Sequence, residues 1–335
     1  MEDILKLERV SKFFERGFLR KVRIYAVNDV SLSLGDGEVV ALVGESGCGK
    51  TTLGKMAAGL IRPSEGRVLW LGKDVWRMSK DEYSKYRPLV QVIHQDPYAS
   101  LNPARTVYQT LSAPIVRYGL AKGKKEVTER VKELLSYVGL TPPKYFLNKY
   151  PHHLSGGMKQ RLSIARAIIP RPKVIIADEP ISMVDMSLRL SVLDLLKRLN
   201  KELGIAFLFI SHELASARYF AREGRTAIMY LGHIVEVGGT EELLNNPLHP
   251  YLRAILSAMP LPDPKLARRR RLLPLKSLEL PSLMELPKGC PFNTRCPYAK
   301  DVCVKERPEL TPKSEGHLVA CHLVDELPEW KPPWA

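Results

Sequence analysis

The sequence predicts an α/β fold in which helices cover a mostly parallel sheet. Three short apolar runs, at residues 38–43, 173–178 and 205–210, read as buried strands. Each run follows a segment with helical character, which is typical of parallel strands joined by crossover helices. An apolar fraction of 45% fits a globular protein with a sizeable core.

Further elements are predicted on both sides of these strands. Residues 60–74, with the turn sequence Pro63-Ser64-Glu65-Gly66, predict a hairpin. Residues 126–139 predict a helix, because their apolar side chains recur at helical spacing. The stripe consists of Val127, Val131, Leu134, Leu135 and Val138.

Proline marks a change in the chain near residue 246. Of the 26 prolines, 15 lie at or after Pro247, where only residues 251–259 predict a helix. We therefore expect a main domain at residues 1–245 and a C-terminal extension at residues 246–335. The extension is too irregular to build a large core of its own, so it packs on the main domain or is held by a crosslink.

Charge and hydropathy limit the partners and the location. The formal net charge is +15, but it is spread along the chain, and the only dense basic run is residues 268–271. This spread favours a solvated basic surface, such as one facing anionic lipid headgroups, over a nucleic-acid interface. The chain opens Met1-Glu2-Asp3 and has no apolar run of about 20 residues. We expect a cytoplasmic protein that does not cross the membrane itself.

A glycine-rich loop directly follows the first apolar strand and matches the pattern G-x-x-x-x-G-K-[ST]. Its residues are Gly44, Glu45, Ser46, Gly47, Cys48, Gly49, Lys50 and Thr51. The glycines let backbone amides approach phosphate oxygens. We expect Lys50 to reach the β- and γ-phosphates, Thr51 to ligate Mg²⁺ and Thr52 to donate to the α-phosphate. The loop predicts a bound nucleoside triphosphate.

Polar side chains follow two of these apolar runs, and Gln95 follows a further apolar run that ends at Ile93. The ends of such strands are where parallel sheets bind ligands. Asp178 is placed to bind Mg²⁺ through water, and Glu179 to act as general base on the attacking water. Gln95 is placed to contact Mg²⁺ or that water. His212 is placed to contact the γ-phosphate and to sense its loss.

A second candidate phosphate site lies in residues 154–161, which read Leu154-Ser155-Gly156-Gly157-Met158-Lys159-Gln160-Arg161. Ser155 reads as the N-cap of a helix whose first backbone amides are offered to an anion. A chain with one phosphate loop does not need a second cradle for the same nucleotide. We therefore expect this one to serve the nucleotide of a neighbouring chain.

These motifs, in this order, resemble the ATP-binding subunit of an ABC transporter over residues 5–245. The glycine-rich loop is similar to the family's Walker A motif, Asp178-Glu179 to its Walker B motif and Gln95 to its Q-loop. The Ser155 stretch is similar to the family signature, and His212 to its switch histidine.

The D-loop of the family is matched by residues 182–185, which end in Asp185. Met183-Val184 stands where the family usually has Ala-Leu. The resemblance implies a P-loop NTPase fold with a mostly parallel sheet, an antiparallel subdomain and a helical subdomain. It implies ATP and Mg²⁺ as ligands, with the signature residues Ser155, Gly156 and Gly157 and the D-loop Asp185 at the nucleotide. It also implies an aromatic residue stacked on adenine. We expect Phe14 in this role, with Tyr25 as the alternative because residues 15–25 look like an insertion.

The C-terminal extension narrows the resemblance. His249-Pro250-Tyr251 and residues 95–103 look like the ATPases of oligopeptide and dipeptide importers, and this chain resembles the second of their two ATPase types. Met158 stands where many second-type chains have Gln. The resemblance implies a second homologous ATPase subunit, two membrane permease subunits and an extracytoplasmic substrate-binding protein. It places the chain on the cytoplasmic face of the membrane as a peripheral subunit.

The cargo expected from this resemblance is an oligopeptide or, with less support, an oligosaccharide. A soluble ABC ATPase acting on nucleic acid or on the ribosome is the rival interpretation. It has only the high pI of about 9.6 in its favour. The interval between Gln95 and Leu154 is too short for the coiled-coil arm of such proteins.

Four cysteines in the extension form one further candidate site: Cys290, Cys296, Cys303 and Cys321. Disulfides are disfavoured in a reducing cytoplasm, and the paired C-x₂-C knuckles of zinc ribbons are missing. All-cysteine ligation suits a [4Fe–4S] cluster, which several of the similar importer tails carry. A structural [4Fe–4S] cluster is the favoured interpretation, Zn²⁺ is the next, and disulfides or free thiols are the third.

Overall fold

The computed structural model describes residues 3–16, 22–260, 263–269, 272–282 and 286–331. In spatial order, the strands of its main sheet are β11 (Thr311–Ser314), β12 (His317–Val319), β10 (His233–Gly239), β9 (Arg225–Tyr230), β3 (Val39–Val43), β8 (Ala206–Ser211), β7 (Val174–Asp178) and β6 (Val90–Ile93). A second sheet has the order β2 (Val22–Gly35), β1 (Asp3–Arg16), β4 (Glu65–Trp70) and β5 (Lys73–Asp74), and all its neighbouring strands are antiparallel.

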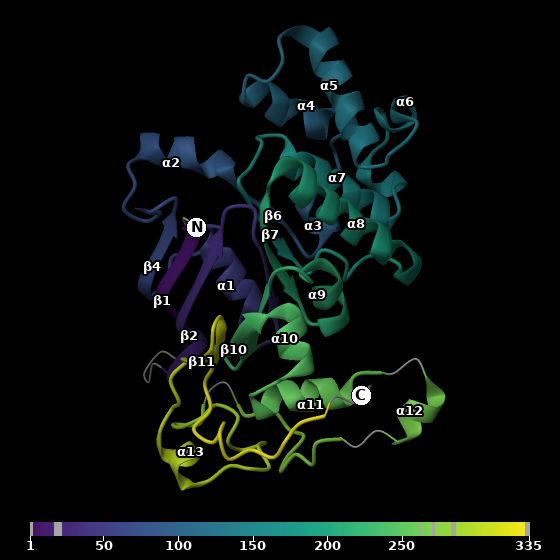
Figure 1. Cartoon of the computed structure of the whole chain (residues 1–335). Coiled ribbons are helices and arrows are strands. Elements are labelled where there is room, and N and C mark those ends of the chain that lie inside the picture. Colours follow the sequence, from purple (N-terminus) through teal and green to yellow (C-terminus); the bar gives the residue numbers. More distant parts are fainter. Residues whose placement is uncertain (1–2, 17–21, 261–262, 270–271, 283–285, 332–335) are drawn as a thin grey trace.

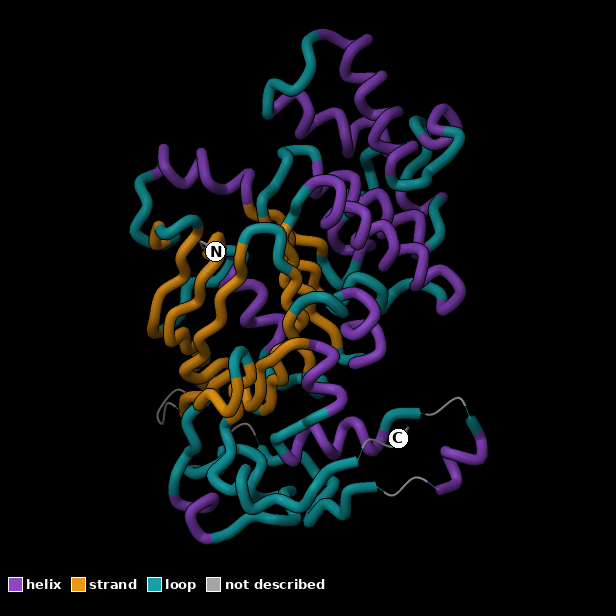
Figure 2. Tube along the Cα trace, viewed as in Figure 1, coloured by secondary structure: helices purple, strands orange, loops and turns teal. Residues whose placement is uncertain are grey.

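The helices are α1 (Lys50–Ala57), α2 (Lys80–Tyr86), α3 (Pro97–Ser100), α4 (Val107–Arg117), α5 (Gly123–Tyr137), α6 (Pro143–Phe146), α7 (Gly156–Ile168), α8 (Met186–Leu203), α9 (Leu214–Phe220), α10 (Thr240–Asn245), α11 (Pro250–Ala258), α12 (Pro264–Arg269) and α13 (Asp301–Lys305). Short 3-10 turns lie at Arg87–Leu89 and Pro151–His153. Helices α4, α5 and α6 lie at one end of the molecule and the C-terminal extension at the other, with the sheets between them (Figures 1 and 2).

The predicted parallel sheet is confirmed. Strands β9, β3, β8, β7 and β6 run parallel to one another, and the three predicted apolar runs are β3, β7 and β8. Along each strand, alternate side chains enter two different cores. In β8, Phe207 and Phe209 pack in the core that includes α8 and α9, while Leu208 and Ile210 pack in the core that includes α1 and the second sheet. Burial on both faces explains why β3, β7 and β8 are apolar along nearly their whole length, without an alternation of apolar and polar residues.

The predicted turn at residues 63–66 is wrong. The hairpin of this region is β4–β5, and it turns at Leu71 and Gly72, whose φ angles are 48° and 76°. Two consecutive positive φ angles suit a tight hairpin turn. Gly66 instead lies inside β4, where a Cβ would come within 2.3 Å of the Arg9 carbonyl oxygen. Glycine is needed there because β1 passes close by.

The predicted helices are confirmed, with small shifts at their ends. Helix α5 begins at Gly123 and buries Val127, Val131 and Leu135, and α11 begins at Pro250. The basic run at residues 268–271 is described only in part, because residues 270 and 271 lie outside the described ranges.

The C-terminal extension packs on the main domain, as predicted. Strand β12 continues the main sheet through its pairing with β10. The ring of Tyr251 lies 4.5 Å from that of Tyr230 in β9, centroid to centroid. Nε2 of His317 is hydrogen-bonded to the carboxylate of Glu236 at 2.8 Å. The Glu236 side chain is fully buried, and it also accepts from the backbone N–H groups of Leu248 and His249. Apolar burial and this buried pair join the extension to the sheet.

Candidate active site

The glycine-rich loop connects β3 to α1, and its shape depends on glycine at two places. Gly49 precedes α1 with φ 108°, and a Cβ there would lie 2.0 Å from the Ala26 carbonyl oxygen. A Cβ on Gly44 would lie 2.1 Å from the Met229 carbonyl oxygen. The tip of the loop, Ser46 and Gly47, is exposed. The loop thus presents backbone at the start of a helix, where phosphates bind.

The side chains predicted to act on the phosphates are buried or half-buried. Lys50 is buried, and its Nζ donates to the carbonyl oxygens of Gly44 at 2.8 Å and Glu45 at 2.9 Å. Cys48 is buried too, and burial raises the pKa of its thiol. Thr52 is half-buried on α1. The Lys50 ammonium therefore lies within the curve of the loop, from which it can turn to a phosphate.

The predicted Mg²⁺ residues lie around one cavity of about 280 Å³, lined by Thr51, Gln95 and Asp178 among others. The Thr51 hydroxyl donates to Asp178 Oδ1 at 3.1 Å. Burial raises the pKa of Asp178, and the hydrogen bond from Thr51 opposes this. A hydroxyl and one carboxylate suit Mg²⁺, which keeps several waters and takes its remaining ligands from phosphates.

The three predicted catalytic side chains meet at one carboxylate oxygen. Gln95 Nε2 lies 3.0 Å and His212 Nδ1 lies 3.2 Å from Glu179 Oε2. Gln95 follows β6, Glu179 follows β7 and His212 follows β8, so the carboxyl ends of neighbouring parallel strands bring them together. Glu179 has φ 44°, and its backbone N–H donates to the Ile210 carbonyl oxygen at 3.0 Å. This backbone hydrogen bond fixes the position of the Glu179 Cα, and so the point from which its carboxylate extends.

The signature forms the start of α7, as predicted. Ser155 is the N-cap, and its hydroxyl accepts from the Met158 backbone N–H at 3.4 Å. A Cβ on Gly156 would lie 2.6 Å from the Met183 carbonyl oxygen, so the signature packs directly on the D-loop. Gly157 is buried, and a Cβ added to it would lie 3.1 Å from a methyl carbon of Leu188. None of the signature residues lines the described cavity at Thr51 and Asp178.

Arg189 connects the D-loop to the loop that contains His212 and Glu213. The sequence analysis did not predict this contact. Asp185 is the N-cap of α8. Arg189 in α8 donates to the Val184 carbonyl oxygen at 3.2 Å and to Glu213 at 2.9 Å. Glu213 adjoins His212, so the two loops are held in one arrangement. No spacing in the sequence signals this pair.

The two candidates for adenine stacking differ in exposure. Phe14 near the end of β1 is 49% exposed. Tyr25 in β2 is half-buried, and its ring centroid lies 5.4 Å from that of Phe13. The exposed ring of Phe14 is the one available to a base, and its role stays a prediction.

The four cysteines of the extension line one small cavity, together with Phe292 and Leu323 among others. All five cysteines of the chain are free of disulfides. Burial raises the pKa of Cys290 to about 12 and that of Cys321 to about 11. Among the residues that the structure describes, no three His, Cys, Asp or Glu side chains are arranged to hold a single metal ion.

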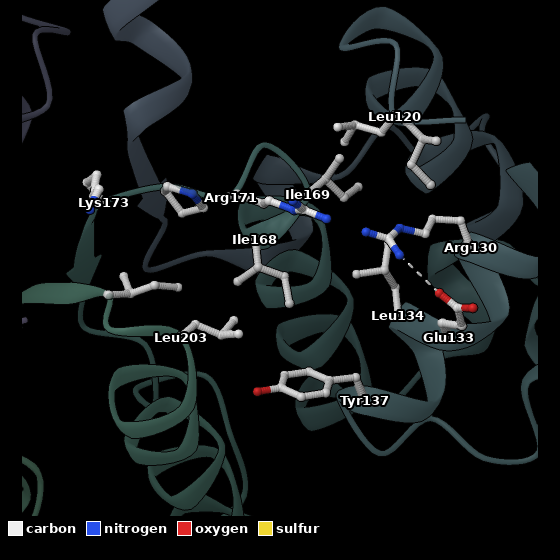
Figure 3. Close-up of a pocket in the computed structure, with 13 residues that line it drawn as sticks. Leu120, Arg130, Glu133, Leu134, Tyr137, Ile168, Ile169, Arg171, Lys173 and Leu203 are labelled. Carbon is white, nitrogen blue, oxygen red and sulfur yellow. Dashed lines mark hydrogen bonds and ion pairs between the residues drawn. The ribbon is translucent and has the colours of Figure 1, made fainter. Parts of the chain in front are cut away.

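A larger cavity, of about 490 Å³, lies away from these sites (Figure 3). It is lined by apolar side chains such as Leu134 and Ile168 and by an ion pair between Arg130 and Glu133. No residue of the nucleotide motifs lines it. We assign it no part in the chemistry.

Comparison with known proteins identifies the class. A family described as "ABC transporter" matches residues 27–182. A solved structure entitled "Dimeric structure of a post-hydrolysis state of the ATP-binding cassette MJ0796 bound to ADP and Pi" aligns with a TM-score of 0.62 and 30% identity, over 70% of this chain and 98% of that one. The fold is that of an ABC transporter ATP-binding cassette, and the chain is an ATPase.

The family follows from the rest of the chain. A family described as "Oligopeptide/dipeptide transporter, C-terminal region" matches residues 235–303. The oligopeptide transport ATP-binding protein OppF of Salmonella typhimurium is 45% identical over 302 residues, which are 90% of this chain and 89% of that protein. The oligopeptide transport ATP-binding protein AppF of Bacillus subtilis is 43% identical over 96% of this chain and 98% of that protein. The chain belongs to the ATP-binding subunits of oligopeptide/dipeptide ABC transporters.

No helix among the described residues is long and apolar enough to cross a bilayer. The relatives named above bear oligopeptide-transport names. They lend no support to the oligosaccharide cargo or to the nucleic-acid and ribosome alternative.

Proposed function

We propose that this chain energises the import of oligopeptides by pairing with a second, homologous ATPase subunit at the cytoplasmic face of the membrane. Two membrane permease subunits and an extracytoplasmic substrate-binding protein complete the transporter. The names of the relatives and the match of the C-terminal region support a peptide cargo. The proposal divides the chain into a nucleotide-binding domain at residues 1–245 and an extension at residues 246–335.

The observation that carries the pairing is the start of α7, a capped helix N-terminus outside the lining of the chain's own Mg²⁺ cavity. Such an end carries roughly +0.5 elementary charge. Met158, Met183 and Met186, on or beside the signature and D-loop, are 39%, 51% and 77% exposed. Exposed apolar side chains grouped around an anion site fit a surface that a partner covers. In the pair, Ser155 and Gly157 face the γ-phosphate held by the partner's phosphate loop.

Hydrolysis uses the cluster at Glu179. Its carboxylate accepts a hydrogen bond from the attacking water and draws the proton away, while Gln95 and His212 hold the carboxylate and the water in line. Lys50 moves from the loop carbonyls to the β- and γ-phosphates. Mg²⁺, when bound through Thr51 and Asp178, neutralises charge on the phosphate oxygens. Loss of the γ-phosphate removes the partner contact and reopens the pair.

A basic cavity beside the Q-loop supports a docking place for a permease. This cavity, of about 480 Å³, is lined by four arginines and a histidine, with apolar side chains between them. The basic residues are Arg87, His94, Arg105, Arg117 and Arg166. His94 precedes Gln95, so a segment bound here moves with the catalytic loop. The charge favours an acidic loop of a permease subunit.

The four cysteines are proposed to hold a [4Fe–4S] cluster, with Zn²⁺ as the alternative. Four thiols from three separate segments line one cavity, and all-cysteine ligation is the chemistry of a [4Fe–4S] cluster. A single Zn²⁺ would need the thiols to move closer together, because no three of the described side chains are arranged for one metal ion. The cluster's role in the proposal is structural. It closes the proline-rich extension on itself.

A cap substitution tests the shared site. Asp is as good an N-cap as Ser, so Ser155→Asp keeps α7 while placing a negative charge against the partner's γ-phosphate. Ser79→Asp, at the N-cap of the remote helix α2, is the matched control. Both are introduced into a chain silenced by Glu179→Gln and measured in complex with the partner ATPase. We expect S155D to reduce phosphate release by at least about tenfold, because stabilisation of transition-state charge is lost. Equal rates for S155D and S79D contradict the shared site.

A further inference from the structure

The C-terminal extension contacts Glu45, the second residue of the phosphate loop, at two groups: its backbone N–H and its side-chain carboxylate. Its backbone N–H donates to the hydroxyl oxygen of Tyr251 in α11 at 3.0 Å. Its carboxylate accepts from Arg295 Nη1, at 2.9 Å on Oε2 and 3.2 Å on Oε1. Tyr251 and Arg295 lie 206 and 250 residues further along the chain.

These contacts are shielded from water on the side of the extension. Tyr251 is 1% exposed and the Arg295 side chain 8% exposed, whereas the Glu45 side chain is 32% exposed. The Arg295 guanidinium lies 5.8 Å from the ring centroid of Tyr230 and 5.7 Å from that of Phe292. Burial alone would lower the pKa of Arg295, but its hydrogen bonds to Glu45 and Tyr230 raise it. A pair in such a place is more constraining than an exposed ion pair, which water and salt weaken.

Arg295 itself is fixed in the cysteine-bearing segment. Its backbone N–H donates to the Phe292 carbonyl oxygen at 3.0 Å, and its carbonyl oxygen accepts from the Lys276 backbone N–H at 3.0 Å. Asn293, two residues earlier, donates to the Cys303 carbonyl oxygen at 3.1 Å. The guanidinium therefore extends from a segment whose backbone is held in place by several hydrogen bonds.

The same loop residue touches the catalytic lysine. The Glu45 carbonyl oxygen accepts from Lys50 Nζ at 2.9 Å and from the Cys48 backbone N–H at 3.3 Å. A shift of the Glu45 peptide would move both the lysine and the turn that precedes it. Two contacts on one residue thus connect the extension to the atoms that receive the triphosphate.

We propose that Arg295 and Tyr251 are positioning residues for nucleotide binding, through which the C-terminal extension holds the phosphate loop in its binding shape and sets the affinity for ATP. The inference rests on the proposed role of residues 44–51 as the phosphate site. It assigns the extension a task in the ATPase reaction, in addition to its packing on the sheet.

The test measures the dissociation constant of MgATP for the full-length chain, by competition with a fluorescent ATP analogue. Tyr251→Phe removes only the hydroxyl and keeps the ring among its aromatic neighbours. Arg295→Met removes the charge at similar size, and Arg295→Lys restores it. Arg307→Ala is the matched control, because Arg307 joins the extension to the main domain through Asp29, at 2.9 Å, without touching the loop.

We expect Y251F and R295M each to weaken MgATP binding by about tenfold, which corresponds to about 1.4 kcal/mol. R295K recovers part of the affinity, and R307A stays within about twofold of the unsubstituted chain. In the assembled transporter, Y251F and R295M raise KM and leave kcat at saturating ATP within about twofold, since lost binding shared by ground and transition states affects KM alone. A purely structural role would lower thermal stability without this split.

Two outcomes separate this inference from the proposed function. Lys50→Ala is included because it removes the lysine of the loop itself. If K50A loses MgATP binding while Y251F and R295M bind as tightly as R307A, the positioning role is overturned and the loop assignment stands. If K50A binds MgATP normally, the loop is not the phosphate site, and both ideas fail together.

Discussion

Replacing Glu179 by Gln separates ATP binding from ATP hydrolysis. Gln has nearly the size of Glu, and its carbonyl oxygen can still accept from Gln95 and His212, which now lie 3.0 and 3.2 Å from Glu179 Oε2. The substitution therefore keeps the geometry and removes the proton acceptor. A positioned general base contributes about 10²–10⁴ in rate, so we expect kcat at this chain's own phosphate loop to fall by about 10²–10⁴, which corresponds to about 2.7–5.4 kcal/mol of lost transition-state stabilisation.

Affinity for MgATP should change little, because Lys50 and Thr51 do not touch Glu179 in the described contacts. Two measurements give these quantities: equilibrium binding of a fluorescent ATP analogue, and phosphate release by an assembled transporter in which the partner subunit's own phosphate-loop site has been inactivated. Glu202→Gln is the control, since that carboxylate lies on the surface and bonds to Tyr137. Hydrolysis by E179Q at a rate near that of E202Q would refute the general-base assignment.

Two further predictions concern the extension. Burial raises the pKa of Glu236; burial alone would lower the pKa of His317, but its hydrogen bonds to Glu236 and Glu242 raise it. Both raised values mean that the folded chain binds more protons than the unfolded chain, so the free energy of unfolding falls as pH rises above about 6.5, the ordinary value of His. As pH rises from 6 to 9, the melting temperature should fall less steeply in His317→Gln than in the unsubstituted chain, because the variant lacks about one proton whose binding is linked to folding. An unchanged slope would contradict this origin. Anaerobic purification should yield a brown protein with iron and sulfide and absorption near roughly 400 nm, lost in Cys296→Ser; a colourless protein with stoichiometric zinc would replace the cluster by Zn²⁺.

Much of the nucleotide site could be predicted from the sequence, because its motifs are local. A strand, a glycine-rich loop and a helix start form one continuous segment around Lys50, so spacing alone places the phosphate cradle. The convergence of Gln95, Glu179 and His212 was also predictable, since parallel strands bring their carboxyl ends to one edge. The hairpin turn near residue 63 was mispredicted because a Pro-Ser-Glu-Gly sequence reads as a turn, whereas Gly66 is required by the close approach of β1.

The sequence by itself therefore predicts the chemistry of this protein through a phosphate loop, a general base and a signature helix, and it contains the four cysteines of the extension. Only the tertiary structure decided that the extension adds β12 to the main sheet and places Arg295 and Tyr251 on Glu45. The physical reason is separation along the chain. Local motifs depend on backbone geometry within a few residues, whereas a contact spanning 250 residues depends on how every intervening strand and helix packs.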